Sequence, residues 1–232
     1  MIMRGDPTDQ VVAAYYRVRQ MLGALGVGLP FMLLFAGWVE EGRILPSLSD
    51  YYHTIQRDIF VGCLFAIGTF LIAYRGHDRA PGETVSDEIL TNIAGISAIA
   101  IALFPSEAEA QEVTTLTQAA FGLRAAVLGH YLFAQAFLYS LAWMCFVHFG
   151  RTGSPRRRAV YRGCGLAIVA VGIVATLAAI GRRFGSEAIH SFVIDNSIVF
   201  WCEAVGVWAF GIAWLTKGRA EMLLTRRRTR VA

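Results

Sequence analysis

The sequence has few charged residues for its length, and this scarcity is its first informative feature. Only 16% of its 232 residues are Asp, Glu, Lys or Arg, whereas 56% are hydrophobic and the mean hydropathy is +0.51. Soluble domains carry about 25% charged residues, so this chain lacks the polar surface of an ordinary soluble domain. The same composition excludes a disordered chain, a collagen-like chain and a coiled coil.

Motifs that would identify a disulfide-rich or metal-binding protein are also absent. The four cysteines form no Cys-x-x-Cys pair and no two of them share a predicted loop, which argues against structural disulfides and zinc knuckles. The sequence contains no His-Glu-x-x-His motif. Hydrophobic and polar residues do not alternate, which argues against a transmembrane β-barrel.

The hydrophobic residues instead lie in six blocks, each near the roughly 20 residues that a helix needs to cross the hydrocarbon core. These blocks are Met21–Val39, Ile59–Tyr74, Ile89–Phe104, Ala126–Phe149, Cys164–Ile180 and Phe192–Leu215. The sequence therefore predicts an all-α, polytopic integral membrane protein. It has a six-helix transmembrane domain at 21–216, between an N-terminal segment at 1–20 and a basic tail at 217–232.

Basic residues determine the predicted orientation, because Lys and Arg resist transfer across the membrane. With six spans, sixteen of the 21 Lys and Arg residues fall on the side of the two termini. Both termini are therefore predicted to be cytoplasmic, in a multi-pass protein of the plasma (inner) membrane. We expect no cleaved signal sequence, because the first twenty residues include Asp6 and Asp9 and have no apolar core.

Two arginine runs lie on the predicted cytoplasmic side. They comprise Arg156, Arg157 and Arg158 in the fourth loop, and Arg226, Arg227 and Arg228 in the tail. We interpret both runs as topology determinants that contact anionic phospholipid headgroups. The pI near 9.0 follows from this orientation, so no nucleic-acid partner is predicted from it.

Polar residues gather on the predicted extracytoplasmic side, where three histidines come from separate parts of the chain. His53 precedes the second span, His130 lies about one turn inside the fourth, and His190 precedes the sixth. Neutral imidazoles with a carboxylate suit a tetrahedral Zn²⁺ that keeps one position open for water. We predict Ser49 and Asp58 as catalytic groups and the three histidines as metal ligands, although ordinary hydrogen bonding also explains the histidines.

A second group of polar residues lies within the sixth hydrophobic block. Glu203 is near the membrane midplane, and Asn196 is seven residues earlier on the same predicted helix face, next to Asp195. An ionised carboxylate at that depth is costly, so Glu203 is expected to be protonated, paired or in contact with a wet cavity. It could form an interhelical hydrogen bond or belong to a proton or substrate relay.

The Ser49-x-x-x-His53 spacing at the start of a span resembles the CREST superfamily of membrane hydrolases. This group includes alkaline ceramidases, adiponectin-receptor-like proteins and the lipid remodellers of GPI anchors. Its members are helical bundles in which a Ser, an Asp and three His surround a zinc ion near one membrane face. The resemblance implies zinc ligands at His53 and His190, with Ser49 and Asp58 assisting the water.

The resemblance covers only the start of the second span and one histidine before the last. The family usually has seven spans, and its last span carries His-x-x-x-His. This chain has Ile194 at the second of those positions, so only His130 could replace the missing ligand. The Arg-Asp-Ile-Phe-Val-Gly string that follows is similar to strings in bacterial multi-span membrane proteins.

Several functions therefore remain open. A zinc-dependent hydrolase would cleave a lipid ester or amide at the extracytoplasmic face. A transporter, channel or proton-coupled carrier would use Glu203 and Asn196. A b-type haem protein would use His130 with His53 or His190 as axial ligands. A structural protein would use its polar residues only to hold the helices together.

Overall fold

Helices account for every regular element in the part of the chain that the computed structural model describes. This part comprises residues 7–74, 76, 85–107, 112–150 and 154–228, with side chains described between residues 14 and 218. The elements are α1 (Pro7–Glu41), the 3₁₀ helix η1 (Leu48–His53), α2 (Arg57–Ala73), α3 (Asp87–Leu103), α4 (Leu116–Phe121), α5 (Leu123–Trp143), the π-helical turn η2 (Met144–Phe149), α6 (Pro155–Phe184), α7 (Glu187–Asp195) and α8 (Ile198–Arg228). The predicted all-α class is confirmed for these residues.

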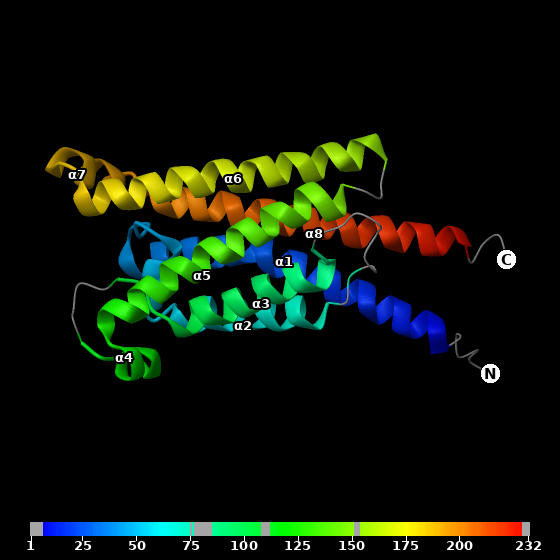
Figure 1. Cartoon of the computed structure of the whole chain (residues 1–232), viewed down its shortest axis with the longest axis horizontal. Helices are drawn as coiled ribbons and strands as arrows, with labels where there is room; N and C mark the ends of the chain where they lie inside the picture. Colours follow the sequence, from blue (N-terminus) through cyan, green and yellow to red (C-terminus); the bar gives the residue numbers. More distant parts are fainter. Residues whose placement is uncertain (1–6, 75, 77–84, 108–111, 151–153, 229–232) are drawn as a thin grey trace.

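The long helices run up and down along one axis, with both termini at one end of the bundle and α4 and α7 at the other (Figure 1). Neighbouring helices pack in the order α1, α2, α3, α5, α6 and α8, and α8 returns against α1, so the six form a closed ring. Buried side chains fill the ring, among them Ile67, Leu71, Phe200, Phe210 and Trp214. Short segments such as η1 cover the end opposite the termini.

Within the described part of the chain, four segments are long and apolar enough to cross a membrane. They are Ala14–Glu41, Leu123–Phe149, Pro155–Phe184 and Ile198–Gly218. The helices α2 and α3 have 17 residues each. At 1.5 Å per residue this gives about 26 Å, against about 30 Å for the hydrocarbon core. The chain therefore has the helices of an integral membrane protein, and its second and third predicted spans are its shortest.

The predicted sixth span, Phe192–Leu215, is wrong at its start, because α7 and α8 are separate helices with two residues between them. Ser197 has a φ of 46°, in the left-handed region that interrupts a helix. The Asn196 side chain donates a hydrogen bond to the Phe192 carbonyl over 2.9 Å, which helps to end α7. Asn196 and Glu203 therefore do not share a face of one continuous helix, and that prediction is also wrong.

The helices α2 and α3 approach each other closely at two glycines. A Cβ atom on Gly68 would lie 2.7 Å from the carbonyl oxygen of Gly95, and a Cβ atom on Gly95 would lie 2.6 Å from the carbonyl oxygen of Gly68. Both neighbours are backbone atoms within helices, so they cannot rotate away as a side chain can. Small residues are what allow helices in lipid to pack at this distance.

We expect the Gly95→Ala variant to lower the free energy of unfolding by about 1–3 kcal/mol, because the added methyl group overpacks the α2–α3 contact. Gly62→Ala on α2 is the matched control, since nothing lies within 4 Å of the Cβ position there. Thermal unfolding of the purified variants in detergent measures the difference. Equal destabilisation by both substitutions would show that the close approach does not limit the packing.

Candidate functional site

The segment before α2 brings a serine of η1 against a histidine of α5. Ser47 is the N-cap of η1, and its hydroxyl accepts a hydrogen bond from the Ser49 backbone N–H over 3.0 Å. This cap fixes the first turn of η1, in which the Ser49 Oγ lies 2.9 Å from His130 Nε2. Both residues are buried, with 8% of Ser49 and 2% of His130 exposed.

The second ring nitrogen of His130 determines the tautomer of its neutral imidazole. His130 Nδ1 lies 2.7 Å from the carbonyl oxygen of Phe104, the residue that ends α3. A carbonyl oxygen only accepts, so Nδ1 carries the proton and Nε2 is an acceptor. Nε2 therefore accepts a hydrogen bond from the Ser49 hydroxyl. A nucleophile beside a base that a third group orients is the arrangement that activates a serine.

A second serine and histidine support the same segment. The Ser106 hydroxyl donates to the Ser49 carbonyl oxygen over 3.0 Å. His53 Nε2 lies 3.2 Å from the Ser106 carbonyl oxygen and 3.3 Å from its hydroxyl oxygen. Partial burial lowers the pKa of His53; the hydrogen bond with the Ser106 backbone opposes this shift, and the positive charge of Arg57 adds to it. Ser106 thus contacts both His53 and Ser49.

Glu203 of α8 holds the start of η1. Its Oε2 accepts one hydrogen bond from the Ser47 hydroxyl over 2.6 Å and another from the Leu48 backbone N–H over 2.8 Å. Ser47 and Leu48 are both buried, so these donors depend on a partner within the protein. Glu203 therefore ties α8 to the segment that carries Ser49, and we interpret it as a positioning residue.

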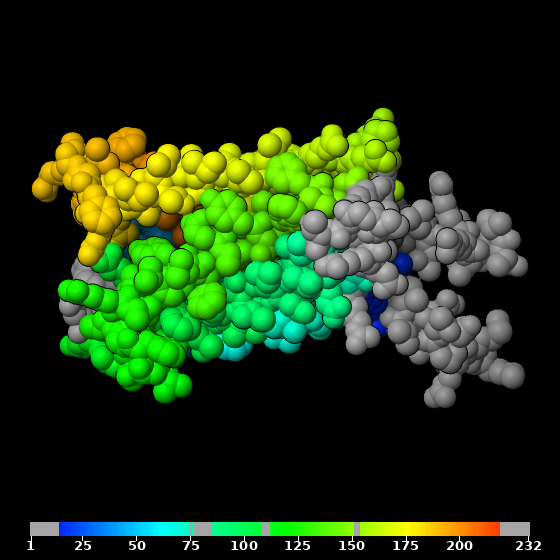
Figure 2. Space-filling view, viewed as in Figure 1, coloured from blue at the N-terminus to red at the C-terminus, as the bar shows by residue number. Residues whose placement is uncertain are grey.

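The molecular surface is hollowed between α5 and α6 at the α7 end of the bundle (Figure 2). Blue atoms from the chain before α2 and orange-brown atoms from α8 are visible inside this hollow. Nearer the middle of the bundle, Gln135 of α5 donates to the Thr176 hydroxyl of α6 over 3.2 Å. In the last turn of α6, Arg182 lies 3.8 Å from the Asp50 carboxylate of η1. The hollow thus lies at the end of the bundle that holds η1.

Three of the predicted site residues lie outside the cluster around Ser49. Asp58 is exposed in the first turn of α2. His190 is exposed on α7, where its Nδ1 lies 2.9 Å from the Arg182 carbonyl oxygen at the end of α6. Asp195 is exposed at the end of α7. The structure therefore brings Ser49, His53 and His130 together, with Glu203 at the start of the same segment. It leaves Asp58, His190 and Asp195 apart from them.

The predicted zinc ligands do not form a ligand group in this arrangement. Both ring nitrogens of His130 have hydrogen-bond partners, His53 Nε2 contacts Ser106, and His190 Nδ1 contacts a backbone carbonyl. Within the described ranges, no three His, Cys, Asp or Glu side chains are placed to hold a metal ion. These residues do not fit zinc as they lie, and a zinc ion stays a prediction from the family resemblance.

Two contributors to the site were missed by the sequence reasoning. Ser47 and Ser106 are single serines in short connections, and neither belongs to a recognisable motif. The available signal was a Pro-Ser pair at each position, Pro46-Ser47 and Pro105-Ser106, since proline stops a helix and leaves a polar group beyond its end. Phe104 acts through its backbone carbonyl, which no side-chain pattern reveals.

Comparison of the chain with protein-family models, curated proteins and solved structures found no match.

Proposed function

We propose that this chain is an integral membrane hydrolase that cleaves an ester or amide bond of a lipid at the extracytoplasmic face. One observation carries the proposal. Ser49 Oγ lies 2.9 Å from His130 Nε2, while Nδ1 of the same ring lies 2.7 Å from the Phe104 carbonyl oxygen. These atoms supply a nucleophile, a base and a group that orients the base. The long apolar helices supply the contact with lipid.

The proposed reaction uses these residues in two steps. His130 Nε2 takes the Ser49 proton as Oγ attacks the lipid carbonyl carbon, and the imidazolium then gives this proton to the departing alcohol or amine. Water next attacks the acyl-serine, with His130 again as the base, and the fatty acid leaves as Ser49 regains its proton. The Phe104 carbonyl stabilises the imidazolium in both steps, because it accepts the hydrogen bond from Nδ1.

The proposal includes six membrane spans and two cytoplasmic termini. In support, α2 and α3 complete the ring between α1 and α5, so a bilayer around the four longest spans would also surround them. Arg156, Arg157 and Arg158 lie in the first turn of α6, at the end of the bundle with both termini (Figure 1). Arginines there favour the cytoplasmic side and attract anionic headgroups. The side chains of Arg226, Arg227 and Arg228 lie outside the described residues.

The hollow between α5 and α6 supports a route for a lipid (Figure 2). It opens between two helices whose outward side chains are apolar, including Leu128 and Leu132 of α5 and Leu177 and Ile180 of α6, all of which are exposed. A lipid in the outer leaflet can therefore approach η1 from the side without leaving the bilayer. Such lateral entry suits a substrate with two long acyl chains and a polar head.

A turnover assay tests the proposal. The purified protein is reconstituted in vesicles of mixed phospholipids, and released fatty acid and lyso-lipid are measured by mass spectrometry. We expect wild-type protein to release one of these products and the Ser49→Ala variant to release none above the background. A fluorophosphonate probe should label the wild-type serine and leave the variant unlabelled. An active Ser49→Ala variant would contradict the proposal.

A chelator separates this mechanism from zinc chemistry. We expect hydrolysis by the Ser49–His130 pair to continue in the presence of a strong chelator, because neither residue needs a metal ion to act. Activity that disappears with the chelator and returns with added zinc would contradict the serine mechanism. It would favour the zinc-dependent hydrolase that the family resemblance implies.

A further inference from the structure

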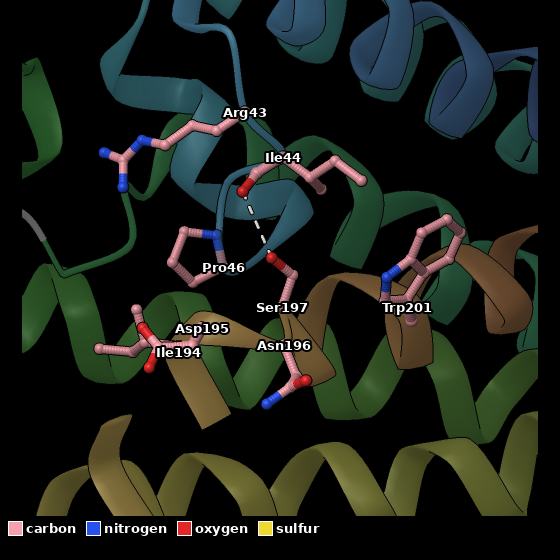
Figure 3. Close-up of a pocket in the computed structure, with 8 residues that line it drawn as sticks. All are labelled: Arg43, Ile44, Pro46, Ile194, Asp195, Asn196, Ser197 and Trp201. Carbon is pink, nitrogen blue, oxygen red and sulfur yellow. Dashed lines mark hydrogen bonds between the residues drawn. The ribbon is translucent and has the colours of Figure 1, made fainter. Parts of the chain in front are cut away.

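A pocket of about 440 Å³ lies near the Ser49 segment, at the end of the bundle opposite the termini (Figure 3). One wall is the connection after α1, which contributes Arg43, Ile44 and Pro46. The other wall is the end of α7 and the start of α8, which contributes Asp195, Ser197 and Trp201. The pocket therefore joins two segments that are far apart in the sequence.

Two hydrogen bonds join the two walls. The Ser197 hydroxyl donates to the Ile44 carbonyl oxygen over 3.3 Å, and the Phe200 N–H of α8 donates to the Pro46 carbonyl oxygen over 2.8 Å. Ser197 has a φ of 46°, a conformation that a residue with a side chain rarely adopts. Strained residues of this kind are concentrated at ligand sites, where the surrounding contacts maintain them. The pocket is thus formed before any ligand arrives.

The pocket presents opposite charges from its two walls. Arg43 supplies a guanidinium from the first wall and Asp195 a carboxylate from the second, and both side chains are exposed. Among the eight residues drawn in Figure 3, the Ser197–Ile44 bond is the single hydrogen bond, so these two charged groups do not neutralise each other by hydrogen bonding. Because both side chains are exposed, a ligand in the pocket can reach both charges.

The pocket lining also includes the end of a helix and an aromatic side chain. The first turn of α8 begins beside the pocket, and the N-terminal end of a helix carries partial positive charge that favours an anion. The indole of Trp201 is 41% exposed and lines the pocket across from Asp195 (Figure 3). The pocket thus has an anion-binding group at Arg43 and a cation-binding group at Asp195, and Figure 3 shows both on the same side of the pocket.

We propose that this pocket binds a phosphodiester that carries an ammonium group, as in the headgroup of a zwitterionic phospholipid. Arg43 binds the phosphate, and Asp195 binds the ammonium. This inference rests on the proposed function and names its substrate class. Pro46 is three residues before Ser49, so their Cα atoms are at most about 11 Å apart, less than the roughly 15 Å of one hydrocarbon leaflet. Pro46 of the pocket wall and Ser49 therefore lie within the length of one lipid.

Binding is tested in the Ser49→Ala background, so that turnover does not interfere. Titration calorimetry in detergent measures the affinity for dihexanoyl phosphatidylcholine, dihexanoyl phosphatidylglycerol and water-soluble glycerophosphocholine. We expect phosphatidylcholine to bind about tenfold more tightly than phosphatidylglycerol, which lacks the ammonium group. Glycerophosphocholine should bind weakly; equal affinity for it would overturn the assignment to a lipid and leave a free zwitterion as the ligand.

Two charge-removing variants assign the parts of the pocket. Arg43→Gln should weaken both lipids about tenfold, and Asp195→Asn should remove only the preference for phosphatidylcholine. The exposed Arg124→Gln and Asp58→Asn variants are the matched controls and should bind as the parent does. Unchanged binding in both pocket variants, or equal affinity of the parent for both lipids, would overturn the inference. Selective binding without hydrolysis in the wild-type protein would overturn the proposed function alone.

Discussion

Replacement of His130 by glutamine is expected to lower kcat for lipid hydrolysis about 10²- to 10⁴-fold, the usual contribution of a general base. His130 Nε2 is the one base in contact with the Ser49 hydroxyl among the described residues, at 2.9 Å. A glutamine amide can still donate to the Phe104 carbonyl, which keeps the α3–α5 contact, but it cannot take up the serine proton near neutral pH. Product release from reconstituted vesicles, normalised to folded protein, measures the loss.

His53→Gln is the matched control for this experiment. His53 is the last residue of η1, and the hydrogen bonds of its ring are with Ser106. The Ser49 hydroxyl is hydrogen-bonded to His130 instead. We therefore expect His53→Gln to keep most of the activity. The Ser49→Ala, His130→Gln double variant should be no slower than Ser49→Ala alone, because both residues serve one proton transfer. A fully active His130→Gln variant beside an inactive His53→Gln variant would show that the base has been assigned to the wrong histidine.

Much of the fold could be predicted because the hydrophobic blocks follow directly from composition. A helix satisfies its own backbone, so a long apolar run is helical wherever it lies in the chain. The prediction of one continuous helix in the sixth block was wrong at Asn196 and Ser197, where α7 ends and α8 has not yet begun. A single residue in the left-handed region ends a helix there, and its conformation depends on contacts with Ile44, 153 residues away. No local pattern contains that information.

The site could be predicted only in part, for a related reason. Ser49, His53 and His130 were recognised because polar residues at the edge of an apolar span are costly and conspicuous. The contacts that these residues make could not be predicted. The Ser49–His130 contact joins residues 81 positions apart, and the group that orients His130 is a backbone carbonyl. His190 was expected at the same depth, but α7 carries it away from η1 as an exposed residue.

The Glu203→Ala variant is expected to lower the free energy of unfolding by about 2–6 kcal/mol, because it leaves two buried donors without an acceptor at about 1–3 kcal/mol each. These donors are the Ser47 hydroxyl and the Leu48 N–H, which now share Glu203 Oε2. Hydrolysis should fall as well, since the same bonds hold the segment that carries Ser49. Chemical or thermal unfolding in detergent, followed by circular dichroism, measures the first effect.

Two control variants show whether acceptance of these hydrogen bonds is what matters at Glu203. Glu203→Gln keeps a carbonyl oxygen that can accept from both donors, so its loss of stability should be well below that of Glu203→Ala. Glu107→Ala removes a carboxylate from an exposed ion pair with Arg183 and should cost less than about 1 kcal/mol.

A proton-coupled carrier would give a different result at Glu203. The Glu203→Gln variant would then keep full stability yet abolish proton-driven flux in liposomes. That pair of results would assign the Glu203 carboxylate to transport, because a hydrogen-bond acceptor that only positions η1 does not need to exchange a proton.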